Sequence, residues 1–166
     1  MTDQDQKTGE RADSVSRAPA RDKEDEEMRS LNMFARPRMD AAGQVEWDLD
    51  NNPSPQIDTK LPIVLPVKSG EHEIVFHIVP ASGLDFEFDC NDPIWTADNS
   101  DCPPAQGDNS TQINVVDCKP KKLTITNENS GAARLVRYQL NFVNKGTGPA
   151  SSACDPAILN GGGGRL

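Results

Sequence analysis

From residue 61 onward, large apolar side chains recur at every second position, in short runs separated by turn residues. Residues 84–88 read LDFEF and residues 135–143 read LVRYQLNFV. A period of two is that of a strand with one face in a core and the other in solvent. A slip of one residue would expose the large side chains of such a strand, so its register is strongly specified. The pattern therefore predicts β-structure around one interior.

Further runs of this kind lie at residues 61–67, 72–79, 112–116, 121–127 and 157–159. Pro62 and Pro66 lack amide protons, which confines the first run to a sheet edge, and we expect the last run to close an edge. The spacing between runs favours a single antiparallel sandwich or small barrel of about seven strands, six to eight, over residues 61–160. We expect its interior to hold the aromatic residues Phe76, Phe86, Phe88, Tyr138 and Phe142.

The first sixty residues have a different composition. Residues 1–60 are acidic, and their large apolar residues are few and scattered. Such a segment cannot bury enough apolar surface to offset about 1–2 kcal/mol of backbone ordering per residue. We therefore predict a disordered acidic tail over residues 1–60, which adds nothing to the interior, and a flexible glycine tail over residues 161–166.

Two stretches within that tail carry a pattern. Residues 22–36 begin acidic and end basic, which suits a helix dipole, and Met28, Leu31 and Phe34 lie three apart. This indicates either a transient helix or a short recognition helix that folds into the groove of a partner. Residues 45–49 read VEWDL, a strand alternation that could dock on the main domain as an extra edge strand.

Charge excludes several classes of partner. The chain of 166 residues carries 26 acidic and 17 basic side chains, a net charge of −9. Because phosphate binding needs a basic surface, we expect no nucleic acid partner. No apolar stretch is long enough for a spanning helix, so we expect no membrane insertion. The polar N-terminus does not read as a secretory signal, so the cytoplasm is the default compartment, with export by a non-classical route left open.

The four cysteines are Cys90, Cys102, Cys118 and Cys154. None stands in a C-x-x-C pair, so a zinc site has weak support, and three disulfide connectivities are open. A Cys90–Cys102 bridge would staple the long polar segment at residues 89–111. In a reducing compartment the thiols would stay free. The sequence does not choose between these outcomes.

Motifs for common catalytic centres are missing. The only histidines, His72 and His77, are five apart in one run and therefore point to opposite faces. Since no methionine follows Met39, a blue-copper site lacks its usual ligands. Neither a G-x-S-x-G motif nor a phosphate-binding loop occurs. We expect no bound cofactor, with calcium as the one candidate metal.

The segment at residues 89–111 is a long polar loop with one apolar anchor, Ile94-Trp95. Calcium takes oxygen ligands, which an aspartate-rich loop supplies, although the spacing D-x-D-x-D-G is missing. The part at residues 89–108 is either a solvated loop or a calcium site. The candidate metal ligands are Asp89, Asp92, Asp98 and Asp101.

Two aspartates stand directly before prolines. Asp92 and Asp155 are either ordinary turn starters or carboxylates that share a proton as acid and base. In the second interpretation they are the catalytic residues of an acid-dependent hydrolase or self-cleaving peptidase.

Several pieces of the C-terminal half resemble one known group. They are the Cys102-Pro103 loop, LTITNEN at residues 123–129, YQLNF at residues 138–142 and DPAILNG at residues 155–161. Together they are similar to the DP-EP family, small and poorly characterised bacterial all-β proteins, over about residues 70–163. The resemblance implies a compact β domain with no established cofactor. An aspartate-dependent peptidase role through Asp155 is an extension of it.

Our first interpretation is a non-enzymatic β-sandwich that binds a protein or peptide partner. The contact would form by strand addition at an exposed edge or through the loop at residues 89–111. The aspartate-dependent hydrolase and the calcium-binding module are the alternatives. The sequence predicts no oligomeric state.

Overall fold

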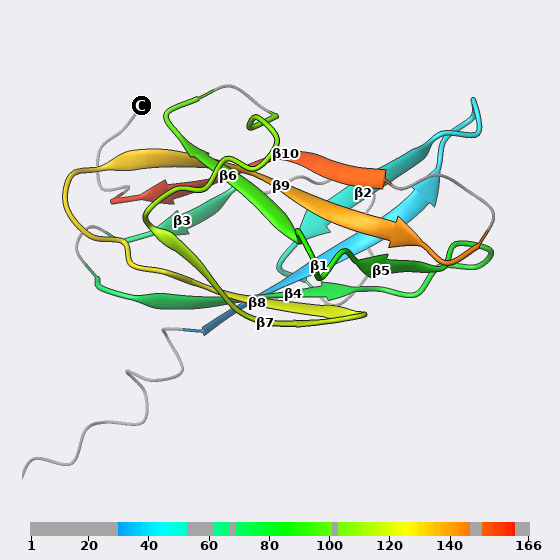
Figure 1. The fold of residues 1–166 in the computed structure, drawn as a ribbon, viewed down its shortest axis with the longest axis horizontal. Coiled ribbons are helices and arrows are strands. Elements are labelled where there is room, and N and C mark those ends of the chain that lie inside the picture. Colours follow the sequence, from blue (N-terminus) through cyan, green and yellow to red (C-terminus); the bar gives the residue numbers. More distant parts are fainter. Residues whose placement is uncertain (1–29, 53–61, 67–68, 101–102, 147–150, 162–166) are drawn as a thin grey trace, which may run out of the picture.

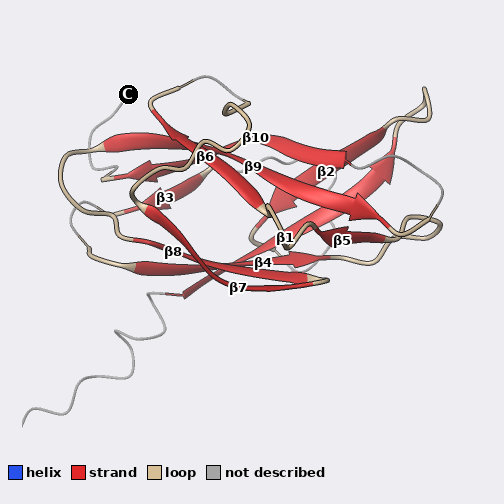
Figure 2. Cartoon of the chain, in the orientation of Figure 1, coloured by secondary structure: helices blue, strands red, loops and turns tan. Residues whose placement is uncertain are grey.

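The computed structural model describes residues 30–52, 62–66, 69–100, 103–146 and 151–161, with the backbone alone for residues 151–156. These residues form ten strands and no helix, arranged as two five-membered groups that Figures 1 and 2 draw as stacked layers. Neither sheet closes on itself, so the predicted two-sheet sandwich is confirmed. Within this part of the chain there is no helix able to cross a membrane.

The first sheet, sheet A, has the strand order β2-β1-β4-β8-β7. Its strands are β1 (Ser30–Met39), β2 (Val45–Asp50), β4 (His72–Ile78), β7 (Ile113–Lys119) and β8 (Lys122–Asn127). Neighbours run antiparallel except β1 and β4, which run parallel. The chain therefore enters sheet A through a strand that lies inside it.

The second sheet, sheet B, has the order β3-β10-β9-β5, with β6 also paired to β9. Its strands are β3 (Ile63–Leu65), β5 (Phe86–Phe88), β6 (Ile94–Asp98), β9 (Arg134–Asn144) and β10 (Ser151–Asn160). Only β3 and β10 run parallel. Ten strands in two mixed sheets correct the expected seven antiparallel ones. The run at residues 61–67 is an edge as predicted, whereas residues 157–159 lie inside sheet B rather than at an edge.

The prediction of a disordered tail over residues 1–60 is wrong for residues 30–52, and so is the domain boundary at residue 61. Strand β1 lies between β2 and β4, and Met33 and Ala35 are buried in the core. Trp47 of β2 stacks on Phe142 of sheet B at 3.8 Å between ring centroids. The N-terminal segment thus supplies part of the interior. Residues 1–29 lie outside the described residues.

The helix predicted over residues 22–36 is wrong from Ser30 onward. Leu31 packs against the core together with Met33 and Ala35, which is a period of two rather than three. Pro37 is tolerated because β1 pairs with β4 only as far as Ala35, so no hydrogen bond to β4 is lost there. Residues 45–49 form the predicted extra edge strand, which is confirmed by β2.

The predicted aromatic interior is confirmed. All five residues are buried, and the two sheets meet through Phe76 and Tyr138, whose ring centroids lie 5.5 Å apart. Burial raises the pKa of the Tyr138 phenol far above its ordinary value, so this hydroxyl stays protonated. The alternation of residues 84–88 and 135–143 therefore matches the side chains that are buried in the core.

Candidate functional site

Strands β5 and β6 are two halves of one interrupted strand beside β9. Phe88 pairs with Phe142 and Ile94 pairs with Leu140, so residues 89–93 loop out between them. The backbone of Asn141 holds both ends of this bulge. The long loop predicted over residues 89–111 is therefore corrected, because residues 94–98 are a strand.

Trp95 is fixed on the outer face of sheet B by the bulge. Its Nε1 donates a hydrogen bond to Oδ2 of Asp92 at 2.6 Å. The side-chain amide of Asn141 donates to the Asp92 carbonyl at 2.8 Å, and that of Gln139 donates to Oδ1 of Asn141 at 2.8 Å. Gln139 is also the cross-strand neighbour of Trp95. The indole orientation is thus set by a chain of polar contacts.

The predicted metal ligands are engaged in separate contacts. Asp89 accepts a hydrogen bond from the backbone amide of Asn91 within a local turn. Asp98 forms an ion pair with Arg134 at 2.9 Å. Over the described ranges, no three histidine, cysteine, aspartate or glutamate side chains gather around a point that could hold a metal ion. Asp101 lies outside those ranges, so calcium binding stays a prediction.

The two candidate catalytic aspartates flank the same strand. Asp92 belongs to the bulge on the β6 side of β9, whereas Asp155 lies in β10, at a register irregularity on the other side. The backbone therefore places them on opposite edges of β9. The side chain of Asp155 is outside the described part, and the catalytic roles stay predictions.

Cys90 and Cys118 form a disulfide, which corrects the predicted Cys90–Cys102 bridge and the free-thiol alternative for these two. Their Cα atoms lie 5.5 Å apart because β7 passes close to the end of β5 in the other sheet. The Phe88 amide donates to the Pro120 carbonyl at 2.9 Å at the same place. The bridge thus joins the two sheets at their edge. Cys102 and the side chain of Cys154 lie outside the described residues.

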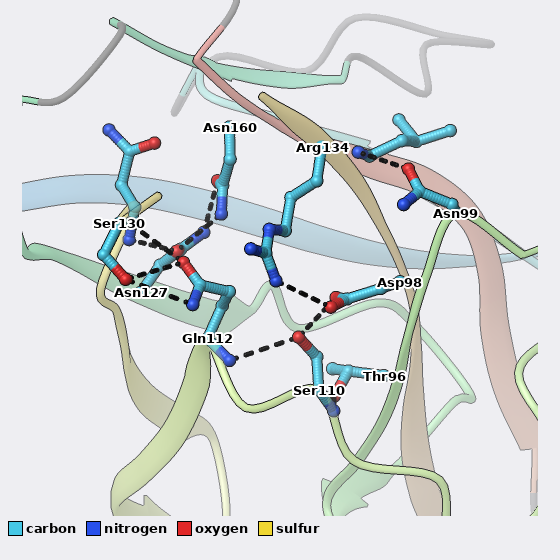
Figure 3. A network of polar contacts seen from close by, with 11 residues as sticks. Thr96, Asp98, Asn99, Ser110, Gln112, Asn127, Ser130, Arg134 and Asn160 are labelled. Carbon is cyan, nitrogen blue, oxygen red and sulfur yellow. Dashed lines mark hydrogen bonds and ion pairs between the residues drawn. The ribbon is translucent and has the colours of Figure 1, made fainter. Parts of the chain in front are cut away.

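A polar network joins the two sheets at one end of the sandwich (Figure 3). The side-chain amides of Asn127 on β8 and Asn160 on β10 exchange hydrogen bonds of 2.8 and 3.0 Å, and both residues are buried. Oδ1 of Asn127 also accepts the backbone amide of Asn129. Because buried amides need partners, this pairing fixes how the strand ends meet.

The network continues toward the start of β9 (Figure 3). The side-chain oxygen Oε1 of Gln112 accepts a hydrogen bond from the backbone amide of Ser130 at 2.9 Å. The backbone amide of Gln112 donates to the hydroxyl oxygen of Ser110 at 3.2 Å. That hydroxyl donates to Asp98, the partner of Arg134. Sequence reasoning missed the amides of this end, since isolated asparagines and glutamines at strand ends give no spacing signal.

The two histidines point to opposite faces of β4, as predicted. His72 is buried, with Nε2 2.5 Å from the Ser69 hydroxyl. His77 stacks on Phe34 at 5.4 Å on the outer face, and its Nε2 lies 2.9 Å from Oδ1 of Asn32. Partial burial, then the charge of Lys122, lowers the pKa of His77 from 6.5. The two imidazoles therefore share no site.

Strand β7 is an edge strand of sheet A and carries two consecutive exposed valines. Val115 is 48% exposed and Val116 is 58% exposed. The pairing with β8 shifts between Val115 and Asp117, so Val116 is the extra residue of a β-bulge. No described strand pairs with the outer edge of β7, so this edge combines free backbone groups with exposed apolar side chains. An added strand uses such an arrangement.

Neither protein-family models nor curated proteins gave a match to this chain. The resemblance to the DP-EP family therefore stays a prediction.

Proposed function

We propose that the protein is a β-sandwich binding module that takes an extended segment of a protein partner as an additional strand beside β7. The observation that carries this proposal is the exposure of Val115 and Val116 on the terminal strand of sheet A. An added strand gains backbone hydrogen bonds from the edge and specificity from side chains at alternate positions.

The other edges are less suited to an added strand. Strand β3 has three residues and stands between Pro62 and Pro66, and β5 also has three. Strand β2 carries charged side chains that form ion pairs with β1, such as the exposed Glu46 with Arg38 at 2.5 Å. Such charges are a common protection of edge strands. Strand β7 is longer than β3 or β5 and contains no proline.

The β-bulge limits the length of the contact. Because Val116 is the extra residue, the regular ladder of β7 divides into residues 113–115 and 117–119. A bulge also discourages edge-to-edge association of identical chains. We therefore infer a short extended peptide as the ligand rather than a long shared sheet.

Charge favours a partner segment with basic flanks. The chain carries a net charge of −9, which attracts cationic segments and repels nucleic acids. No contact among the described residues favours the hydrolase or the calcium module over this binding role.

The test uses a library of random peptides displayed on phage and selected on the full chain. The best selected peptide is then measured by calorimetry against the wild type, Val116→Lys and Val64→Lys. Val64 on β3 is the matched control, since it is 56% exposed against 58% for Val116. We expect Val116→Lys to weaken binding about tenfold or more, because it removes an apolar contact at the centre of the site. Unchanged binding by Val116→Lys, or equal weakening by Val64→Lys, would contradict the proposal.

A further inference from the structure

The outer face of sheet B carries a half-buried arginine that pairs with none of the described side chains. Arg137 on β9 has Ala97 and Ala157 as its cross-strand neighbours. Opposed charges in a sheet normally meet across strands, and alanine offers none. Its Nε is buried without a hydrogen-bond partner, and no carboxylate among the described side chains pairs with the guanidinium.

An indole lies beside this cation on the same face. Trp95 pairs with Gln139, two residues along β9 from Arg137, so the two side chains are diagonal neighbours about 7–8 Å apart at the backbone. The indole nitrogen already donates to Asp92, which leaves the flat ring for contact. The second carboxylate oxygen of Asp92, Oδ1, accepts no hydrogen bond within the described part of the chain.

From this arrangement we propose a second binding site, for a short acidic saccharide such as an oligomer of hexuronic acids. One carboxylate is bound locally at Arg137, whereas the net charge of −9 repels longer polyanions. The carboxylate of one sugar lies against Arg137, because guanidinium groups bind carboxylates in a planar, bidentate manner. The C–H face of the ring packs on Trp95, and a hydroxyl donates to Oδ1 of Asp92. The negative Asp92 at the far end sets the orientation of the ligand.

The chemistry of this face favours a saccharide over a peptide. Strand β9 pairs with β10 on one side and with β5 and β6 on the other, so its backbone groups are engaged. A peptide laid across the face would find no backbone partners there. Sugar hydroxyls, in contrast, bind side-chain carboxylates and amides. The site is on another sheet from β7 and is independent of the proposed peptide function.

The protein contains its own reporter for this site. Of its two tryptophans, Trp47 is 4% exposed within the core, so a ligand on sheet B changes the fluorescence of Trp95. The probe is a galacturonic acid oligomer titrated into the full chain, with its neutral methyl ester and a tryptophan-free peptide with a free C-terminal carboxylate as comparisons. We expect a fluorescence change with the acidic oligomer that weakens as salt is added.

Variants decide which residues carry the effect. We expect Arg137→Gln to weaken calorimetric binding of the oligomer about tenfold or more, and Trp95→Ala to weaken it comparably. Arg134→Gln is the matched control, because Arg134 lies on β9 like Arg137 but its guanidinium is paired with Asp98 of β6. Thermal melts establish that each variant is folded. Absence of binding, equal binding of the neutral ester or the peptide, or full affinity in Arg137→Gln would overturn the proposal. None of these results depends on β7.

Discussion

Asn127 and Asn160 tie the two sheets together through a reciprocal pair of side-chain hydrogen bonds between the ends of β8 and β10. Both residues are buried, so neither amide can exchange its partner for water. A buried polar group that loses its partner costs about 1–3 kcal/mol, whereas replacement of both partners by apolar groups is nearly neutral. The pair therefore specifies how the sheets meet more than it adds to stability.

The first prediction concerns this pair. We expect Asn160→Leu alone to lower the free energy of unfolding by about 1–3 kcal/mol, because the Asn127 amide is left without its acceptor. The double variant with Asn127→Leu loses less than the sum of the two single variants. Denaturant titration of the four proteins measures this coupling. Additive losses would show that the two amides do not interact.

The second prediction tests the place of β1 in the core. Met33 is 2% exposed and Met39, on the same strand, is 53% exposed. We expect Met33→Ala to cost about 2–5 kcal/mol of stability, because it leaves a cavity. Met39→Ala changes stability by no more than about 0.5 kcal/mol. Chemical denaturation compares the two variants. Equal losses of stability would show that Met33 of β1 is not part of the core.

The third prediction concerns the disulfide. The Cys90–Cys118 bridge closes a loop with a sequence separation of 28, which constrains the unfolded chain. We expect Cys118→Ser to lower stability by about 3 to 4 kcal/mol on the chain-entropy model. Peptide mapping without reductant should show residues 90 and 118 linked.

Because disulfides persist in oxidising compartments, we propose that the protein works in such a compartment, contrary to the default cytoplasmic expectation. Recovery of the mature protein with both thiols reduced would contradict this.

The fourth prediction follows from His77. Burial, then Lys122, lowers its pKa in the folded protein from 6.5, so the unfolded chain binds the proton more readily. This contribution to stability is present above pH 6.5 and is lost as the pH falls toward the lowered value. We expect NMR titration of the imidazole to give a midpoint below 6.5 and His77→Gln to flatten the loss of stability on acidification. A midpoint above 6.5 would contradict this prediction, because His77 would then stabilise the folded protein at low pH instead of high pH.

The strands whose two faces differ clearly in polarity could be predicted from the sequence. Residues 84–88 and 135–143 show this alternation, and Phe86, Phe88, Tyr138 and Phe142 are buried as it requires. In β1 the same period was hidden. Arg36 and Pro37 are also buried, and an acidic segment precedes the strand, so the sequence resembled a tail with a helical stripe.

Contacts between the sheets could not be predicted, because they depend on how the layers cross. The partner of Cys90 is set by the passage of β7 near the end of β5, which no sequence spacing encodes. The face that carries the half-buried Arg137 and Trp95 likewise depends on the register between β6 and β9. Asp92 was a candidate for catalysis and metal binding, and the sequence did not indicate its hydrogen bond to Trp95.

The peptide-binding role of β7 is tested most directly by amide hydrogen exchange of the full chain, with and without the selected peptide. An added strand donates to and accepts from the free edge, so exchange should slow in residues 113–119. The β3 edge, with its equally exposed Val64, should exchange at the same rate in both samples. Slowing at β3, or unchanged exchange along β7 at saturating peptide, would contradict the account.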